Sequence, residues 1–193
     1  MLLRVGSRGS RLALIQAELA ASRLRRDGVE IALVPITTAG DRDRSRPFGE
    51  IGSRGVFVKE IEEALLAGRI DVAVHSAKDM TSSDAEGLSV GAYLAREDPR
   101  DALCGASELR PGMRVGTASV RRRAELLALE PELSVEPLRG NVETRLRKRR
   151  ERGLDAVVLA ACGLDRLGLG NEIGRTNKTF RWSDPSITQI RGG

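Results

Sequence analysis

The fold class is decided by a run of apolar residues that ends in a polar cluster, Ile70-Asp71-Val72-Ala73-Val74-His75-Ser76-Ala77-Lys78-Asp79. Residues 70–75 are almost continuously apolar, which is typical of a strand buried on both faces of a parallel sheet. The polar residues follow at the carboxyl end of this strand. Ligands bind at that edge of open α/β folds, so the stretch predicts a fold class and a site together.

Short strands alternate with helices on both sides of this stretch. In the first half we predict strands at residues 3–5 and 31–37. One helix follows residues 7–10, with Leu12, Ile15 and Leu19 on its buried face, and a second helix over 57–67 ends at Gly68. This alternation predicts parallel strands joined by right-handed crossovers.

The second half of the chain repeats the same order of elements. We predict strands at residues 114–116, 134–138 and 154–161, the last of them fully apolar. Helices are predicted from the turn at 117–119 to Leu129 and over 141–152.

Two α/β lobes of about 90 residues each account for this repetition. Each lobe is predicted to be a mainly parallel sheet flanked by helices, with a ligand cleft between the lobes. The expected domains are residues 1–94, an arginine-rich second lobe over 95–170, and an atypical tail over 171–193. Residues 40–55 are too long and polar for a plain connector, so we predict a mobile lid there.

The composition excludes several classes of protein. The chain has 193 residues and a formal net charge of +5, and no window of about 19 residues is free of charge, so no membrane helix is expected. The first residues lack the pattern of a secretory signal. Cys104 and Cys162 are too few and too far apart for a disulfide framework or a metal site, and we expect both to be small buried residues. Cytoplasm is therefore the expected location.

Arginine dominates the basic side chains, because only four of the 32 basic residues are lysine. Codon preference is one explanation, and an acidic ligand is another. A nucleic-acid surface over residues 145–152 is a weaker alternative, since Glu151 interrupts the basic run and no aromatic residues lie within it for base stacking.

Two predicted turns between a strand and a helix, at residues 7–10 and 116–122, combine arginines with hydroxyl groups. A helix N-terminus attracts anions, and a neighbouring guanidinium can bind a carboxylate through two hydrogen bonds. Serine and threonine also cap helices for purely structural reasons. Because the two turns occupy corresponding places in the two lobes, they favour an acidic ligand. Arg139, at the end of a predicted strand, and Arg145, in the next helix, add to this pattern.

The polar cluster at residues 75–79 allows two interpretations. Lys78 and Asp79 can form an ordinary surface pair, or Asp79 can hold a cationic intermediate while Lys78 holds an anion. His75 is the only histidine and has no partner nearby in the sequence, which favours a structural role.

Seven ordered blocks over about residues 2–169 resemble the porphobilinogen deaminase (hydroxymethylbilane synthase) family. They are 8–17 (RGSRLALIQA), 55–60 (GVFVKE), 71–79 (DVAVHSAKD), 96–101 (REDPRD), 116–122 (GTASVRR), 138–145 (LRGNVETR) and 160–168 (AACGLDRLG). The resemblance implies a transferase that condenses four porphobilinogens, with release of ammonia, to the linear tetrapyrrole hydroxymethylbilane of heme biosynthesis.

The resemblance also assigns roles to individual residues. It implies that Asp79 is the catalytic carboxylate, which stabilises a cationic azafulvene and assists proton transfers. It implies that Phe57 packs beside the pyrrole rings, although its helical spacing fits a core role equally well. The residues that it implies bind the carboxylates of cofactor and substrate are Arg8, Ser10, Lys78, Thr117, Ser119, Arg121, Arg122, Arg139, Arg145 and Arg166.

Members of the family carry a dipyrromethane primer on a cysteine of a third domain. We expect this chain to lack that domain, to carry no covalent primer, to end in a non-native tail over 171–193, and therefore to be truncated and inactive. We expect a monomer that binds porphobilinogen, with no metal, nucleic-acid or membrane partner. The two-lobed architecture also resembles type II periplasmic binding proteins, so a carboxylate-binding module without catalysis is the alternative.

Overall fold

The computed structural model describes residues 1–42, 57–80 and 85–174. Contacts within the chain divide it into two compact units, Met1–Ala95 and Arg96–Gly193. Each unit is an α/β structure with a largely parallel sheet flanked by helices, which confirms the predicted fold class.

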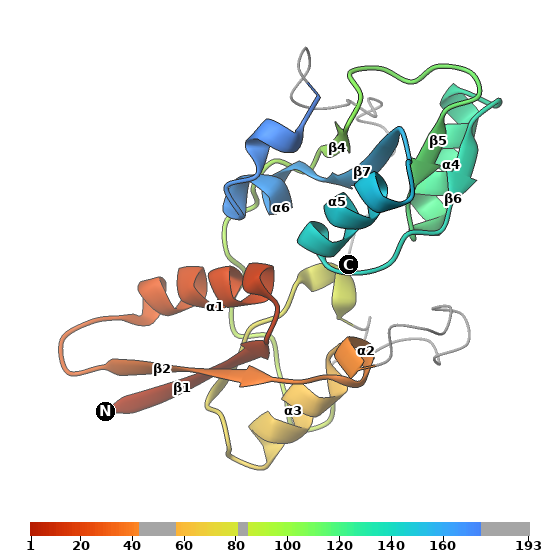
Figure 1. Ribbon diagram of the computed structural model, residues 1–193. Helices are drawn as coiled ribbons and strands as arrows, with labels where there is room; N and C mark the ends of the chain where they lie inside the picture. The colour runs from red at the N-terminus through yellow and green to blue at the C-terminus, as the bar shows by residue number, and fades with distance from the viewer. Residues whose placement is uncertain (43–56, 81–84, 175–193) are drawn as a thin grey trace. The chain divides into compact units, whose positions relative to one another are not determined.

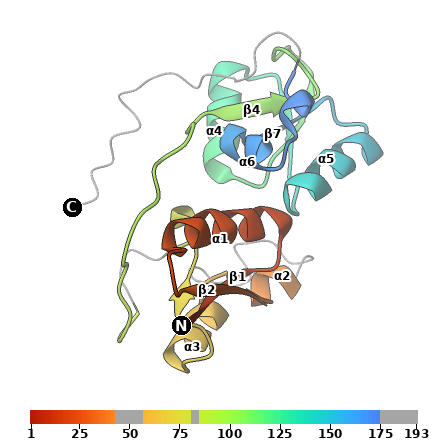
Figure 2. The same ribbon diagram turned by 90° about the vertical axis from the view of Figure 1, so that its left-hand side faces the viewer.

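The first unit contains a parallel sheet in the order β2-β1-β3 (Figure 1). Helix α1 packs on one face of β1 and β2, and α3 lies on the opposite face, as Figure 2 also shows. Val5 in β1 is completely buried between these layers. The elements are β1 (Leu2–Arg8), α1 (Arg11–Leu24), β2 (Glu30–Ile36), α2 (Ala39–Arg42), α3 (Lys59–Leu66), β3 (Val72–Ala73) and the 3-10 turn η1 (Ala77–Asp79).

Three details of the first unit correct the sequence-based expectations. The strand predicted over 70–75 is only two residues long, and only Ile70 is buried there, because among the described residues β3 pairs with β1 alone. Helix α1 is buried through Ala17 and Ala21, whose small side chains let the helix approach the sheet closely. Leu19, which was predicted to be buried, is exposed. Phe57 precedes α3 rather than lying within it.

The second unit has a four-stranded sheet in the order β4-β7-β5-β6. Strands β5, β6 and β7 are parallel, and β4 at the edge is antiparallel to β7. The elements are β4 (Asp101–Cys104), β5 (Arg114–Gly116), α4 (Val120–Leu129), β6 (Ser134–Glu136), α5 (Val142–Glu151), β7 (Ala156–Ala160), α6 (Ala161–Arg166) and η2 (Gly170–Glu172).

Strand β7 is buried on both faces, as its apolar sequence predicts. Val157 and Leu159 belong to a core shared with α5 and α6, while Ala156 and Val158 belong to a core shared with α4 on the other face. The side chains of successive residues alternate between these two cores because the side-chain period of a strand is two residues.

Strand β4 and helix α6 were not predicted. The start of β4 could not be recognised because it lies in the largely charged stretch 95–101. Its first residue, Asp101, is 4% exposed, although aspartate is rarely buried. The predicted lid at 40–55 lies mostly outside the described residues, which include only α2 at its beginning.

Candidate functional site

Functional side chains of the second unit gather at one edge of its sheet. β5 ends at Gly116 and leads through residues 117–119 into α4, while β6 leads to Arg139 and β7 into α6. Because β5, β6 and β7 are parallel, their carboxyl ends lie at the same edge. Asp101 lies there too, since antiparallel β4 pairs Asp101 with Ala160 at the end of β7.

Asp101 is the buried carboxylate at this edge, with 4% of its surface exposed. The guanidinium of Arg122 binds it through both oxygens, with Nε 3.0 Å from Oδ2 and Nη2 2.5 Å from Oδ1. Nη2 of Arg121 donates to Oδ2 at 3.0 Å. Arg122 is also tied to the sheet by a hydrogen bond from Nη1 to the Val158 carbonyl at 3.3 Å. The structure therefore brings these two predicted arginines to one buried carboxylate.

Arg145 and Arg139 extend this positive cluster. Burial, together with repulsion from Arg122 and Arg139, lowers the pKa of Arg145 to about 10. Arg145 and Arg139 are brought together by a tight turn, in which Gly140 has φ +129° and a Cβ would meet Thr144 at 2.5 Å. Arg145 Nε donates to the Gly140 carbonyl at 2.6 Å. Like charges thus lie close together at this edge, an arrangement that favours an anionic ligand.

The hydroxyl groups of this edge serve local structure. Ser119 is the N-cap of α4, with its Oγ accepting from the Arg122 amide at 3.3 Å. Thr117 is 5% exposed and its Oγ1 accepts from the Ser119 amide at 3.2 Å. Both residues shape the turn that holds Arg121 and Arg122 at the start of the helix.

Arg166, at the end of α6, is bound to another carboxylate. Its Nη2 lies 2.9 Å from Glu97 Oε1, and its side chain is 18% exposed. Its Nε is buried without a hydrogen-bond partner within the described residues. Among the described residues, the ion pair of Arg166 is with Glu97 and does not involve Asp101, the carboxylate that Arg121 and Arg122 share.

In the first unit, Arg8 is held between a carboxylate and an aromatic ring. Its guanidinium binds both oxygens of Asp41 and lies 4.0 Å from the centroid of the Phe57 ring. Thr38 Oγ1 donates to the same carboxylate at 2.8 Å. Burial tends to raise the pKa of Asp41, but hydrogen bonds from Arg8 and Thr38 outweigh burial and hold the pKa below its usual value. Gly40 permits this packing, because a Cβ there would meet Phe57 at 2.2 Å.

The remaining predicted residues of the first unit lie at the ends of strands or helices. Asp79 is half-buried in η1, beyond the carboxyl end of β3, and Lys78 beside it is exposed. Ser10 caps α1 by accepting from the Ala13 amide at 3.3 Å. His75 is partly buried, which lowers its pKa, and the charge of Asp79 opposes that shift.

Sequence reasoning missed the acidic partners, Asp101 and Asp41. Both lie within charged stretches, and charge alone does not distinguish a buried carboxylate from a solvated one. The signal that could have identified Asp101 is the apolar segment 102–104 immediately after it, which marks the strand that Asp101 begins.

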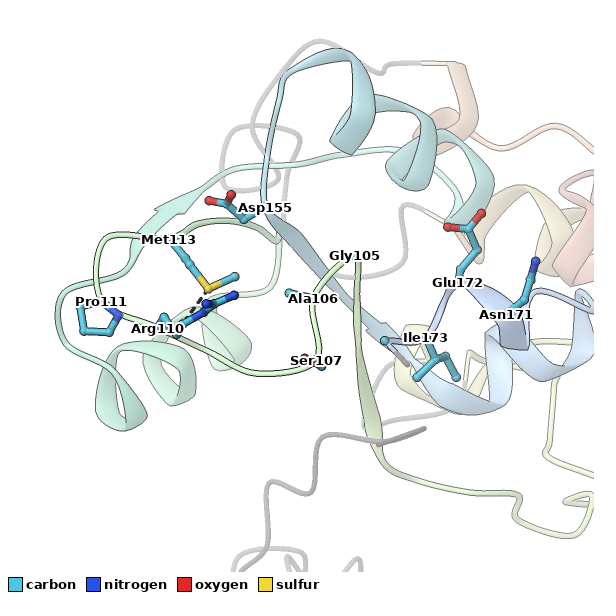
Figure 3. A pocket seen from close by; sticks show the side chains of 11 residues that line it. Gly105, Ala106, Ser107, Arg110, Pro111, Met113, Asp155, Asn171, Glu172 and Ile173 are labelled. Atoms are coloured by element: carbon cyan, nitrogen blue, oxygen red, sulfur yellow. Dashed lines mark hydrogen bonds between the residues drawn. The ribbon is translucent and has the colours of Figure 1, made fainter. Parts of the chain in front are cut away.

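A pocket lies at the opposite edge of the second sheet from these arginines (Figure 3). It is lined by Gly105, after the end of β4, and by Asp155, before the start of β7.

The two cysteines differ in burial. Cys104 is buried, and loss of hydration raises the pKa of its thiol to about 12. Cys162 is only partly buried, which corrects the expectation for that residue.

Two kinds of site are absent from the described part of the chain. No three His, Cys, Asp or Glu side chains within residues 1–42, 57–80 and 85–174 are grouped as metal ligands. No helix in the same ranges is long and apolar enough to cross a membrane.

The fold and the arginine-rich edge define a class of protein, an α/β protein with a basic site suited to carboxylates. The family model described as "Porphobilinogen deaminase, dipyromethane cofactor binding domain" matches residues 3–189. The chain belongs to the porphobilinogen deaminase family. The match extends into residues 171–193, whose expected non-native origin stays a prediction.

Curated relatives named porphobilinogen deaminase support this membership. The porphobilinogen deaminase of Trichlorobacter lovleyi is 48% identical over 97% of this chain and 62% of the relative, and that of Pelobacter propionicus is 50% identical over 97% and 67%. The porphobilinogen deaminase of Syntrophotalea carbinolica is 50% identical over 89% of this chain and 56% of the relative. The chain thus spans about three fifths of the length of the curated relatives it matches.

A solved structure of an ancestral cationic amino acid solute binding protein is a far more distant neighbour. The match covers 83% of this chain and 69% of the neighbour's chain, at 14% identity and with a TM-score of 0.42. This likeness is too weak to bear on function.

Proposed function

We propose that this chain is the carboxylate-binding and proton-transferring part of a hydroxymethylbilane synthase, which condenses porphobilinogens with release of ammonia in the cytoplasm. The observation that carries the proposal is the guanidinium of Arg145, which is repelled by those of Arg122 and Arg139 at the carboxyl edge of three parallel strands. Porphobilinogen carries an acetate and a propionate, and fixed guanidinium groups are well suited to bind both.

The same cluster fits the dipyrromethane cofactor of the family. Repulsion among the arginines lowers the pKa of Arg145, and a bound polycarboxylate would relieve this repulsion. Arg122, Arg139 and Arg145 would hold the cofactor's carboxylates. When bound, the cofactor supplies the primer to which pyrroles are added. Cys104 is unsuited to attach it, because its thiol resists ionisation.

Asp79 is proposed to handle protons in the reaction. It lies beyond the end of β3 and is half-buried, so it can reach a substrate while staying partly shielded from water. Its carboxylate would accept a hydrogen bond from the pyrrole N–H and hold the positive charge that develops as ammonia leaves. It would also take the proton from the attacking ring. Lys78 and Arg8 would bind substrate carboxylates in the same unit.

The test is incubation of the purified chain with porphobilinogen, following ammonia release and tetrapyrrole absorbance in parallel. Intact mass of the protein reports whether dipyrromethane is attached. Asp79→Asn should retain porphobilinogen binding and lose ammonia release. Binding by the wild-type chain without any ammonia release, unchanged in Asp79→Asn, would contradict proton transfer by this chain and leave either a truncated deaminase or a carboxylate-binding module without catalysis.

A further inference from the structure

We propose that Asp101 is a positioning residue that fixes Arg122, and with it Arg121, in the orientation that receives a ligand carboxylate. This inference rests on the proposed function of the arginine cluster. Neither the sequence motifs nor the family resemblance assigned a role to this aspartate.

The first support is the geometry of the contact. Asp101 accepts three hydrogen bonds, two from Arg122 and one from Arg121, at 2.5 to 3.0 Å. It is 4% exposed, and the side chain of Arg122 is 13% exposed. With Nη1 of Arg122 bonded to the Val158 carbonyl, all three nitrogens of that guanidinium are held by the sheet edge. The side chain therefore has a single orientation before any ligand arrives.

The second support is the loss of hydration that burying the Asp101–Arg122 ion pair requires. A buried ion pair gains little over apolar residues of the same volume, because both charges lose their hydration. The surrounding cores show that apolar side chains pack at this sheet without difficulty. A buried carboxylate here is better explained by what it does to Arg122 than by a gain in stability.

The third support is the charge balance. Arg122 lies close enough to Arg145 to lower the pKa of that residue. In the absence of a carboxylate, repulsion from Arg145 would drive Arg122 away from it. Asp101 holds Arg122 against this repulsion through two hydrogen bonds.

Glu125 provides a matched control. It also binds Arg121, at 2.8 Å, but among the described residues no hydrogen bond or ion pair joins it to Arg122, and its side chain is 29% exposed. Removing its charge tests the loss of an acidic group near the site without disturbing Arg122.

The experiment measures porphobilinogen binding by calorimetry with the full chain and its D101N, D101E and E125Q variants, each checked by a thermal melt. D101N should weaken binding about tenfold or more, whereas E125Q should change it less than about twofold. D101E should recover part of the affinity because it keeps the charge. In any turnover assay D101N should raise KM more than it lowers kcat. Folded D101N with wild-type affinity would overturn the proposal.

A second measurement does not depend on ligand or on the folding of D101N. The Nε–H proton of Arg122 in the wild-type chain should exchange with water much more slowly than that of Arg147, which is exposed. Equal exchange rates would overturn the proposal. If the wild-type chain binds no porphobilinogen, the proposed function fails, and slow exchange of this proton would still support the positioning role.

Discussion

Both units hold arginines at the carboxyl edge of a parallel sheet, but they neutralise them differently. In the first unit, Arg8 is matched by Asp41 and stacks on Phe57, so one cation meets one anion. In the second unit, Arg121 and Arg122 share Asp101 and Arg121 also binds Glu125, while Arg139 and Arg145 add further positive charge. The second unit therefore concentrates positive charge, which favours the binding of an anion. The first unit fixes the position of a single guanidinium.

Replacing Arg122 with Met should give the largest effect. It leaves Asp101 charged and buried without its main partner, which should lower the free energy of unfolding by about 3–5 kcal/mol. Urea denaturation measures this change. Arg121→Met is the control, because Arg121 is 61% exposed, and it should cost less than about 1 kcal/mol. Equal losses in both variants would show that Asp101 does not depend on Arg122 in particular.

Replacing Arg8 with Met should have a smaller effect on stability. Asp41 loses its strongest partner but keeps the Thr38 hydroxyl, and its side chain is 22% exposed. We expect a loss of about 1–2 kcal/mol by urea denaturation. Arg25→Met, which removes an exposed pair with Glu18, should change little. A loss as large as that of Arg122→Met would remove the distinction between the two units.

A small tricarboxylate should stabilise the second unit selectively. If citrate binds only the folded chain, it raises the free energy of unfolding by about 0.4 kcal/mol when the citrate concentration equals the Kd. The increase grows with the logarithm of the citrate concentration at higher concentrations. Thermal melts with increasing citrate measure this effect, which should weaken with added salt. Arg145→Met should abolish the shift, whereas Arg8→Met should reduce it much less, because the Arg8 guanidinium is already paired with Asp41. The reverse pattern would place the anion site in the first unit.

The smallest effect concerns acid and the first unit. Hydrogen bonds from Arg4, first from its side chain and then from its amide, lower the pKa of Asp71 to about 2. Such a carboxylate stabilises the fold above its unfolded pKa of about 3.9, and that contribution is lost as the pH falls toward 2. Asp71→Asn should flatten the dependence of unfolding on pH between about 5 and 2. An unchanged slope in the variant would exclude this contribution.

A strand that is buried on both faces could be predicted from the sequence, because it requires a continuous run of apolar residues. Residues 156–160 meet that condition and form β7 as expected, while 70–75, which are apolar except for Asp71 and His75, form only a two-residue strand. The difference is the neighbours: β7 lies between β4 and β5, but β3 pairs with β1 alone within the described residues. Composition reports that a segment is apolar, and the partners of a strand decide how much of it joins the sheet.

The candidate site was predictable in its cations and not in its anions. Arg121, Arg122, Arg139 and Arg145 follow predicted strands, so their common edge could be inferred from the chain order alone. Asp101 could not be found in this way, because its partners are distant in sequence and its strand runs against the others. The pairing of Arg8 with Asp41 was likewise not predicted, and the role of Arg8 toward a ligand stays a prediction.

The sequence by itself determined the fold class, the family and the edge of each sheet where the arginines lie. Apolar periodicity and the order of strands and helices are local properties that can be read along the chain. Only the tertiary structure decided which carboxylate neutralises which arginine. Hydration and charge balance depend on burial and on contacts between distant residues, and those exist only once Asp101 and Arg122 have been brought together.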